Sequence, residues 1–267
     1  MIQDDFIFDG ESLSSHGYMI VSSNSSDESI VASNMNYQTM KAPLSDVSRL
    51  IGTNYEENYS RSFSIIKKDC DGFNRTTTLS NDEISEMTRW LCRKTYKWFR
   101  WESEDMDDEI WYEAMFTVNN MEIGGNVEGL ELTVHTNRPF GVTREIKNIW
   151  NTADEPEKEI IVHTDEEGYT YPNATITLLS GGNINITNTA EDRTTTILNC
   201  SAGEVITIYG EDVLQIETSV ESHDLSKDFN YVFPRLCSEY GNKTNTIEVD
   251  KDAIILFKYR GIRKVGI

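Results

Sequence analysis

The sequence predicts an all-β protein with one main helix and two domains. Three observations lead to this fold class. Apolar and polar residues alternate with a period of two along most of the chain, which is typical of strands that bury one face. One segment, between residues 80 and 96, has the spacing of an amphipathic helix. A polar connector that contains Pro156 separates two series of predicted strands.

The chain opens with two predicted strands. Residues 6–8 (Phe-Ile-Phe) lead into Gly10, and Gly17 precedes residues 18–20 (Tyr-Met-Ile). Short apolar runs beside glycines predict a strand, a tight turn and a second strand. Two acidic residues and no basic segment precede the first run, so we expect no signal peptide.

Three further segments of the first half alternate in the same way. Tyr59, Phe63 and Ile65 fall on one face of a predicted strand, and serines line the other face. Residues 110–118 and 130–134 repeat this pattern. We expect each segment to place one face in a core and the other in water.

The predicted helix has a clear start. Ser80 is a suitable N-cap, and Glu83 three residues later completes a capping box. Ile84, Met87 and Leu91 then fall on one face. The pattern fades near residue 96, where we expect the helix to end, and basic residues in this region would complement its macrodipole.

An aromatic segment follows the helix. Residues 98–101 (Trp-Phe-Arg-Trp) predict a strand, residues 102–109 are mostly acidic, and the chain returns at Ile110. The acidic residues lack the glycine and the ligand spacing of an EF-hand loop. We therefore expect a hairpin with a solvated tip and no metal site.

We place the domain boundary after residue 147, which gives domains of residues 1–147 and 148–267. Beyond the connector, short strands separated by glycine turns predict a β-sandwich. The predicted strands are residues 159–164, 174–179, 183–188, 195–199, 204–209, 245–249 and 254–259.

Charge and cysteine content limit the function. The net charge of −21 is spread over both domains, which disfavours binding to nucleic acid or to anionic membranes and favours solubility. No apolar run is long enough to span a membrane. The four cysteines have no metal or redox spacing, so we expect free thiols in a reducing cytoplasm.

No catalytic motif is present. The sequence has no Gly-x-Ser-x-Gly elbow, no phosphate-binding loop and no zinc spacing among its four histidines. We therefore predict no catalytic, cofactor-binding or metal-ligating residue, and no cofactor. All five tryptophans lie at or before the boundary, so a sugar platform in the second domain would need a tyrosine, for which Tyr169, Tyr171 and Tyr240 are available.

Three blocks of the sequence point together to a known family. They consist of residues 6–10 and 17–20, then residues 61–65, 81–91, 111–114, 129–134 and 139–140, and finally residues 233–236, 245–249 and 255–260. In their order, spacing and total length, these blocks resemble the distal tail proteins (Dit) of long-tailed, siphovirus-type bacteriophages, and the resemblance spans nearly the whole chain.

The resemblance implies an N-terminal β-sandwich with a helix and an extended hairpin, and a C-terminal galectin-like β-sandwich. It implies a hexameric ring at the tip of the tail tube, through which DNA passes without specific binding. The implied partners are the tail tube protein, the tail-associated hub protein and, in some phages, receptor-binding proteins. The protein would be a structural part of the virion, assembled in the host cytoplasm, with no enzymatic activity and no membrane contact.

Two questions stay open at this point. Trp98, Trp101 and Trp111 are the predicted contacts with a neighbouring copy, but all three could equally lie in the domain core, because large aromatic side chains dominate both environments. The alternative function is a monomeric carbohydrate-binding β-sandwich module of a phage adhesion device.

Overall fold

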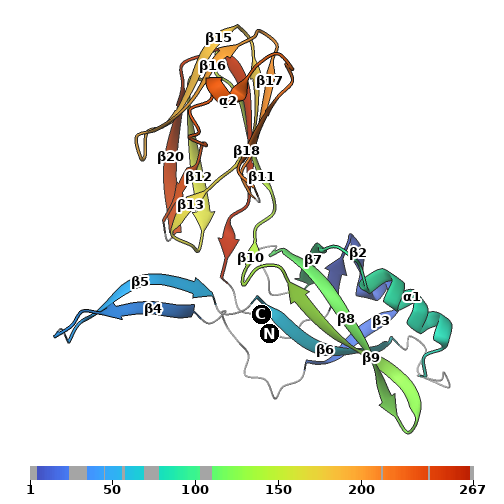
Figure 1. Cartoon of the computed structure of the whole chain (residues 1–267). Coiled ribbons are helices and arrows are strands. Elements are labelled where there is room, and N and C mark those ends of the chain that lie inside the picture. The colour runs from blue at the N-terminus through green and yellow to red at the C-terminus, as the bar shows by residue number, and fades with distance from the viewer. Residues whose placement is uncertain are drawn as a thin grey trace. The chain divides into compact units, whose positions relative to one another are not determined.

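The computed structural model describes residues 5–23, 35–44, 46–55, 58–68, 78–102, 110–211, 213–239 and 241–264. It confirms a mostly β chain with one main helix (Figure 1). The chain forms two units, which divide between Val142 and Thr143. The division lies there because β11 (Ile146–Asn151) pairs with β21 (Ala253–Tyr259) near the end of the chain. The domains proposed from sequence, residues 1–147 and 148–267, remain a prediction.

A seven-stranded antiparallel sheet forms the framework of the first unit. Its strand order is β2-β1-β7-β8-β9-β6-β3, so the two predicted opening strands, β1 and β3, lie far apart in the sheet. A turn at Asp9 and Gly10, both with positive φ, separates β1 from the short β2. The elements are β1 (Asp5–Phe8), β2 (Glu11–Ser12), η1 (Leu13–His16), β3 (Tyr18–Ser23), β6 (Ser60–Lys67), β7 (Lys97–Glu102), β8 (Tyr112–Ile123) and β9 (Asn126–Thr136).

Aromatic side chains fill the core of this unit. The alternation along β1, β6, β7 and β8 turns every second residue inward, as predicted. Phe6 is completely buried and lies at the centre of the cluster. Its ring centroid is 5.5–6.2 Å from the rings of Phe63, Trp90, Phe99, Trp101 and Phe116.

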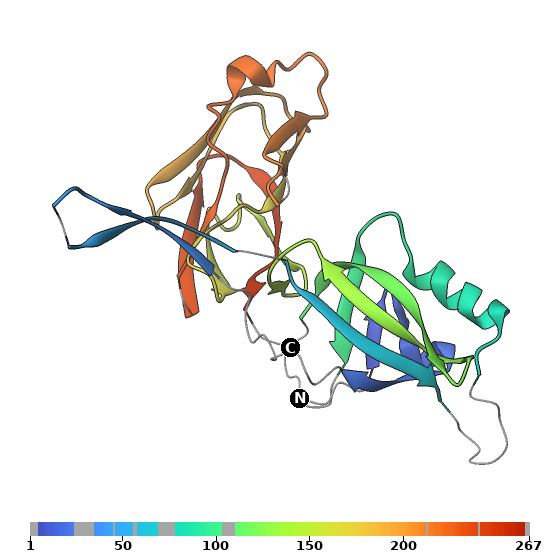
Figure 2. The same ribbon diagram turned by 60° about the horizontal axis from the view of Figure 1, so that its bottom comes forward.

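The single long helix, α1 (Asn81–Leu91), packs against this core (Figure 2). Its predicted capping box is confirmed, because the Ser80 hydroxyl accepts from the backbone N–H of Glu83 while the Glu83 carboxylate accepts from that of Ser80. The predicted end near residue 96 is wrong. The helix ends at Leu91, because Cys92 leaves helical geometry and the chain turns into β7.

A second hairpin was not expected from the sequence. β4 (Met35–Lys41) and β5 (Ser48–Tyr55) pair only with each other among the described strands (Figure 1). The long β8–β9 hairpin also continues past its neighbours, because its pairing extends to Ile123 and Asn126 at a Gly124-Gly125 turn.

The second unit is built from two antiparallel sheets that share one aliphatic core. Their strand orders are β11-β21-β14-β17-β18 and β12-β20-β15-β16. The seven strands predicted here are all present. The short β10 (Gly141–Val142) belongs to the first unit. The remaining elements of the second unit are β12 (Glu157–Thr164), β13 (Gly168–Thr170), β14 (Asn173–Leu178), β15 (Gly182–Asn188), β16 (Arg193–Cys200), β17 (Val205–Tyr209), β18 (Gln215–Thr218), α2 (Leu225–Asp228), β19 (Leu236–Ser238), β20 (Gly241–Val249) and β22 (Ile262–Arg263).

A buried carboxylate braces one end of this unit. Glu204 accepts hydrogen bonds from the hydroxyl of Thr218 (2.5 Å), Nδ1 of His223 (2.5 Å) and the backbone N–H of Ser201 (2.7 Å). The other ring nitrogen of His223 lies 3.4 Å from Asp228 in α2. Burial alone would raise the pKa of Glu204, but these donors hold it below its ordinary value.

We predict that Glu204→Gln destabilises the second unit by about 2 kcal/mol at neutral pH, because it weakens a buried charge-assisted network. Since the pKa of Glu204 is lowered by folding, its stabilising effect is present above the ordinary value of 4.5 and is lost as the pH falls through the lower folded value. Urea unfolding at neutral pH and at about pH 3 measures this difference. The exposed Glu221→Gln serves as the control, and a Glu204 effect that does not shrink in acid would contradict the prediction.

Candidate functional site

The three tryptophans predicted as interface contacts do not share one environment. Side chains alternate along β7, so Trp98 and Arg100 lie on one face while Phe99 and Trp101 lie on the other. Trp101 is only 5% exposed and belongs to the aromatic core. Trp98 and Trp111 are half-buried, which leaves both within reach of a partner.

The structure brings Trp98 and Trp111 together on the outer face of the sheet. Their ring centroids lie 6.4 Å apart and their planes are nearly perpendicular, at 87°. The guanidinium carbon of Arg100 lies 5.3 Å from the ring centroid of Trp111. Trp111 also exchanges two backbone hydrogen bonds of 2.8 Å with Val142, which fixes its position beside Trp98.

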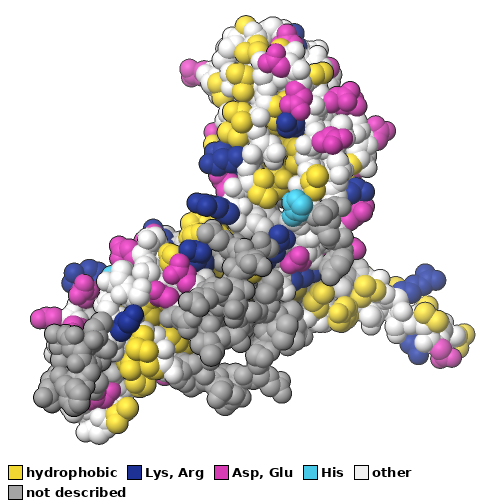
Figure 3. All heavy atoms as spheres, turned by 180° about the vertical axis from the view of Figure 1, so that it is seen from behind, with side chains coloured by type: hydrophobic (Ala, Val, Ile, Leu, Met, Phe, Trp, Pro, Cys, Tyr) yellow, Lys and Arg dark blue, Asp and Glu magenta, His cyan; other side chains and the backbone are white. Residues whose placement is uncertain are grey.

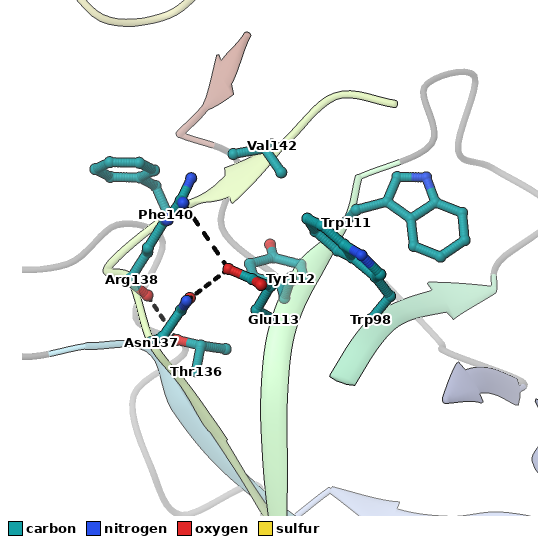
Figure 4. Close-up of a pocket in the computed structure, with 9 residues that line it drawn as sticks. All are labelled: Trp98, Trp111, Tyr112, Glu113, Thr136, Asn137, Arg138, Phe140 and Val142. Atoms are coloured by element: carbon teal, nitrogen blue, oxygen red, sulfur yellow. Dashed lines mark hydrogen bonds and ion pairs between the residues drawn. The ribbon is translucent and has the colours of Figure 1, made fainter. Parts of the chain in front are cut away.

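A shallow recess opens beside this tryptophan pair (Figure 4). Aromatic side chains form part of its wall, and polar side chains from the end of β9 and the following turn form another part. The residues that line it are Trp98, Trp111, Tyr112, Glu113, Thr136, Asn137, Arg138, Phe140 and Val142.

Hydrogen bonds hold the polar side of the recess in place. Asn137 Nδ2 donates to Glu113 Oε2 at 2.6 Å, and Arg138 Nη2 lies 3.8 Å from the same oxygen. The hydroxyl of Thr136 donates to the carbonyl of Arg138 at 2.6 Å. Burial raises the pKa of Tyr112, so its phenol stays neutral. These contacts position a surface, and none of them activates a nucleophile.

The recess is too small for a substrate. Its volume of about 10 Å³ accommodates about one water molecule, whereas small-molecule sites usually enclose at least about 300 Å³. Its lining places aromatic side chains beside the carboxylate of Glu113 at the surface of the unit.

Three further expectations from the sequence concern the acidic tip, metal binding and membrane spans. The acidic tip expected after residue 102 covers residues 103–109, which lie outside the described residues. In the part of the chain that is described, no three His, Cys, Asp or Glu side chains gather in a way that could hold a metal ion. Nor does any described helix have the length and apolar character needed to cross a membrane.

The β4–β5 hairpin is the second part of the candidate site, and sequence reasoning missed it. Every side chain of β4 is exposed, and so are most of those of β5. The signal was weak: Tyr37 and Thr39, which favour strands, alternate with Asn36 and Gln38, and Pro43 marks a turn.

This hairpin exposes a large set of apolar side chains, which Figure 3 shows along the projecting arm. The exposed apolar residues are Met35, Tyr37, Met40, Leu44, Val47, Leu50 and Ile51. An isolated two-stranded hairpin is marginally stable in water, and contiguous exposed apolar side chains mark interaction surfaces. The hairpin therefore exposes an unusual number of apolar side chains for a two-stranded element.

The base of the hairpin adjoins the recess. The ring of Tyr55, the last residue of β5, packs edge-to-face against Phe140 at 5.6 Å. Phe140 is one of the recess residues. The hairpin and the recess are thus neighbouring features of the first unit.

Two protein-family models together match nearly the whole chain. Residues 1–138 match the model described as the phage tail protein N-terminal domain, and residues 140–259 match the model described as the phage tail C-terminal domain. No curated protein matches the chain by sequence.

Solved structures share the fold at low sequence identity. The chain is similar to the Dit (gp 19.1) protein of phage SPP1, described as a paradigm of the hub adsorption apparatus of phages that infect Gram-positive bacteria. The TM-score is 0.62 at 10% identity, over 96% of this chain and 98% of that one. It is also similar to a chain of the phage P2 baseplate in its activated conformation, with a TM-score of 0.51 at 8% identity, over 99% and 100% of the two chains. The fold predicted from the resemblance to distal tail proteins is thereby confirmed.

The different environments of the tryptophans can be tested by stability measurements. We expect Trp101→Ala to lower the free energy of unfolding by about 3–5 kcal/mol, because it opens a cavity in the aromatic core. Trp98→Ala should cost about 1 kcal/mol or less, because its ring is half-exposed. Urea unfolding measures both values. Equal losses in the free energy of unfolding would contradict the difference in burial between the two rings.

Proposed function

This chain belongs to the phage tail protein family, and we propose that six copies of it form a ring at the distal end of the tail tube. The ring joins the tube to the tail-associated hub protein and to the host-adhesion device, which in some phages includes receptor-binding proteins. The full-length similarity in fold to the SPP1 Dit protein supports this assignment.

In this proposal the two domains have different roles. The N-terminal domain, residues 1–147, forms the ring. The C-terminal domain, residues 148–267, is a galectin-like sandwich that projects outward from it. The role is structural and needs no catalytic group, cofactor or metal. The protein resides in the virion, at the tail tip, after assembly in the host cytoplasm.

The exposed β4–β5 hairpin is the observation that most strongly supports the proposed ring. A closed ring requires heterologous contacts, in which one surface of each copy meets a different surface of the next. The hairpin supplies one such surface, because the side chains of β4 and most of those of β5 are exposed, and because these two strands pair only with each other among the described strands. Covering them removes apolar area from water, which is the main driving force of stable association.

The second surface of the contact is the recess beside Trp98 and Trp111. Half-exposed tryptophans that flank a polar pocket are typical of the residues that dominate binding energy at interfaces. Trp101 does not reach this surface, so in the proposal it acts only by holding β7 in place from the core side.

Charge is consistent with the role of the ring. The net charge of −21 is spread along the chain, so a lumen that carries part of it would repel the DNA backbone. DNA could then pass through the ring without binding to it. A solved ring with a basic lumen would contradict this part of the proposal.

The hairpin contact can be tested with two matched substitutions. Ile51 in the β4–β5 hairpin and Ile123 at the tip of the β8–β9 hairpin are similarly exposed, at 63% and 61%. We expect Ile51→Asp to shift the protein from hexamer toward monomer by at least about tenfold in the association constant, because it places a charge in an apolar contact. Ile123→Asp should leave assembly unchanged.

Light scattering and negative-stain images of the full chain, alone and with its tail-hub partner, measure the result. Circular dichroism confirms that each variant is folded. A chain that stays monomeric under both conditions contradicts the ring. Equal losses from the two substitutions contradict the role of the β4–β5 hairpin.

A further inference from the structure

Basic side chains gather where α1 ends and β7 begins. Residues 87–101 contain five Lys or Arg residues and no Asp or Glu, in a chain whose net charge is −21. Arg100 lies on the opposite face of β7 from Lys97 and pairs with Glu102. The other four residues form the basic cluster, which consists of Arg89, Arg93, Lys94 and Lys97.

Among the described residues, a single carboxylate forms ion pairs with the basic cluster. Asp9, in the turn after β1, lies 3.5 Å from Nη2 of Arg93 and 3.6 Å from Nζ of Lys97. Arg89 and Lys94 are exposed, and neither is within ion-pair distance of a described carboxylate. Nε of Arg93 is buried and donates no hydrogen bond to a described residue. The basic cluster therefore has a surplus of positive charge over its one carboxylate.

The fold of the first unit does not account for this surplus. The helix macrodipole attracts cations to the last turn of a helix, but only Arg89 lies in the last turn of α1. Arg93 and Lys97 are held near Asp9, whereas Lys94 pairs with no carboxylate in the described part of the chain. Neighbouring like charges repel one another, which is a cost to the folded state that an external anionic group would remove.

We propose that the basic cluster binds carboxylates on the surface of the neighbouring copy. This inference rests on the proposed ring and adds to it a contact between opposite charges. In a heterologous contact two different surfaces meet, so the basic cluster of each copy can face an acidic surface of the next around the whole ring. The chain has 45 Asp and Glu residues against 24 Lys and Arg residues, so each copy supplies the complementary charge.

The position of the basic cluster favours a copy of this chain as the partner. Lys97 directly precedes Trp98 in β7, and the backbone N–H of Asp9 donates to the carbonyl of Trp98 at 3.0 Å. The basic cluster therefore adjoins the tryptophan pair that forms one side of the proposed contact. Burial of the apolar β4–β5 hairpin would bring two copies together, and the basic cluster would then reduce the repulsion between them.

DNA is the other ligand that such a cluster could attract, because its phosphates bind Lys and Arg. The net charge of −21 repels a polyanion over long distances, and DNA offers no apolar burial to offset that repulsion. The carboxylates of a neighbouring copy are therefore the favoured partner, and a short DNA duplex serves as the competing ligand in the experiment.

Charge reversal with a matched control tests the contact. Arg89→Glu combined with Lys94→Glu should weaken assembly of the full chain at least about tenfold, because it places like charges at the contact. Arg144→Glu combined with Lys147→Glu changes the net charge equally at two exposed residues of the second unit, and should weaken assembly less than about threefold.

Light scattering of the full chain, alone and with its tail-hub partner, measures assembly, and circular dichroism confirms the fold of each variant. The difference between the two charge-reversed variants should shrink in about 0.5 M NaCl, because salt screens exposed charges. Arg89→Lys combined with Lys94→Arg keeps the charge and should preserve assembly.

Cross-linking identifies the partner of the basic cluster directly. A carbodiimide joins the Nζ of a lysine to a carboxylate that lies in contact with it. The ring is assembled from equal parts of unlabelled and isotope-labelled chain. We expect mass spectrometry to find Lys94 or Lys97 joined to an Asp or Glu of a differently labelled copy.

The possible outcomes separate this contact from the ring itself. A ring that assembles without such a cross-link overturns this contact alone, and so do equal losses from the two charge-reversed variants. If Arg89→Glu with Lys94→Glu abolishes binding to the DNA duplex and leaves assembly intact, the basic cluster binds phosphate and the proposal is wrong. A chain that stays monomeric with its tail-hub partner overturns the ring, and this contact with it.

Discussion

The packing of aromatic rings around Phe6 is the interaction on which the first unit depends. Phe6 brings together rings from β6, β7, β8 and α1, so one side chain near the start of the chain fixes four later elements. Because side chains alternate along β7, drawing Trp101 into this core forces Trp98 to the opposite face. The tryptophan pair and its recess thus follow from the core, and the outer surface could not be rearranged without disturbing it.

Local patterns in the sequence predicted much of this architecture. The capping box at Ser80 and Glu83 set the start of α1, and the strands of the second unit follow directly from their alternation. The end of α1 could not be predicted, because basic residues that were expected within the helix lie beyond it and contact another part of the chain. Arg93 and Lys97 both approach Asp9, at 3.5 and 3.6 Å, from beyond the helix. Such contacts depend on tertiary packing that no local pattern records.

Only part of the candidate site could be predicted from the sequence, because the rest of it also depends on tertiary packing. Composition singled out the tryptophans, but only the pairing of β7 with β8 shows which of them remains accessible. The β4–β5 hairpin was missed because the side chains of β4 and most of those of β5 are exposed, so that neither strand shows a buried face. A strand pattern is easiest to read where one face is buried. A strand whose side chains would be buried only by another copy need not show the regular alternation of apolar and polar residues that marks a strand with one face in its own core.

The negative charge of the chain gives a further reason why the apolar β4–β5 hairpin would suit a contact between copies. Copies that each carry a net charge of −21 repel one another, and this repulsion has to be overcome in any closed assembly. Among its described residues the hairpin has few charges, with Lys41 and Asp46 already 3.8 Å apart. It can therefore approach a neighbouring copy with little electrostatic cost. In the proposed ring, burying the arm would also stabilise the hairpin itself, because a lone two-stranded hairpin is only marginally stable in water.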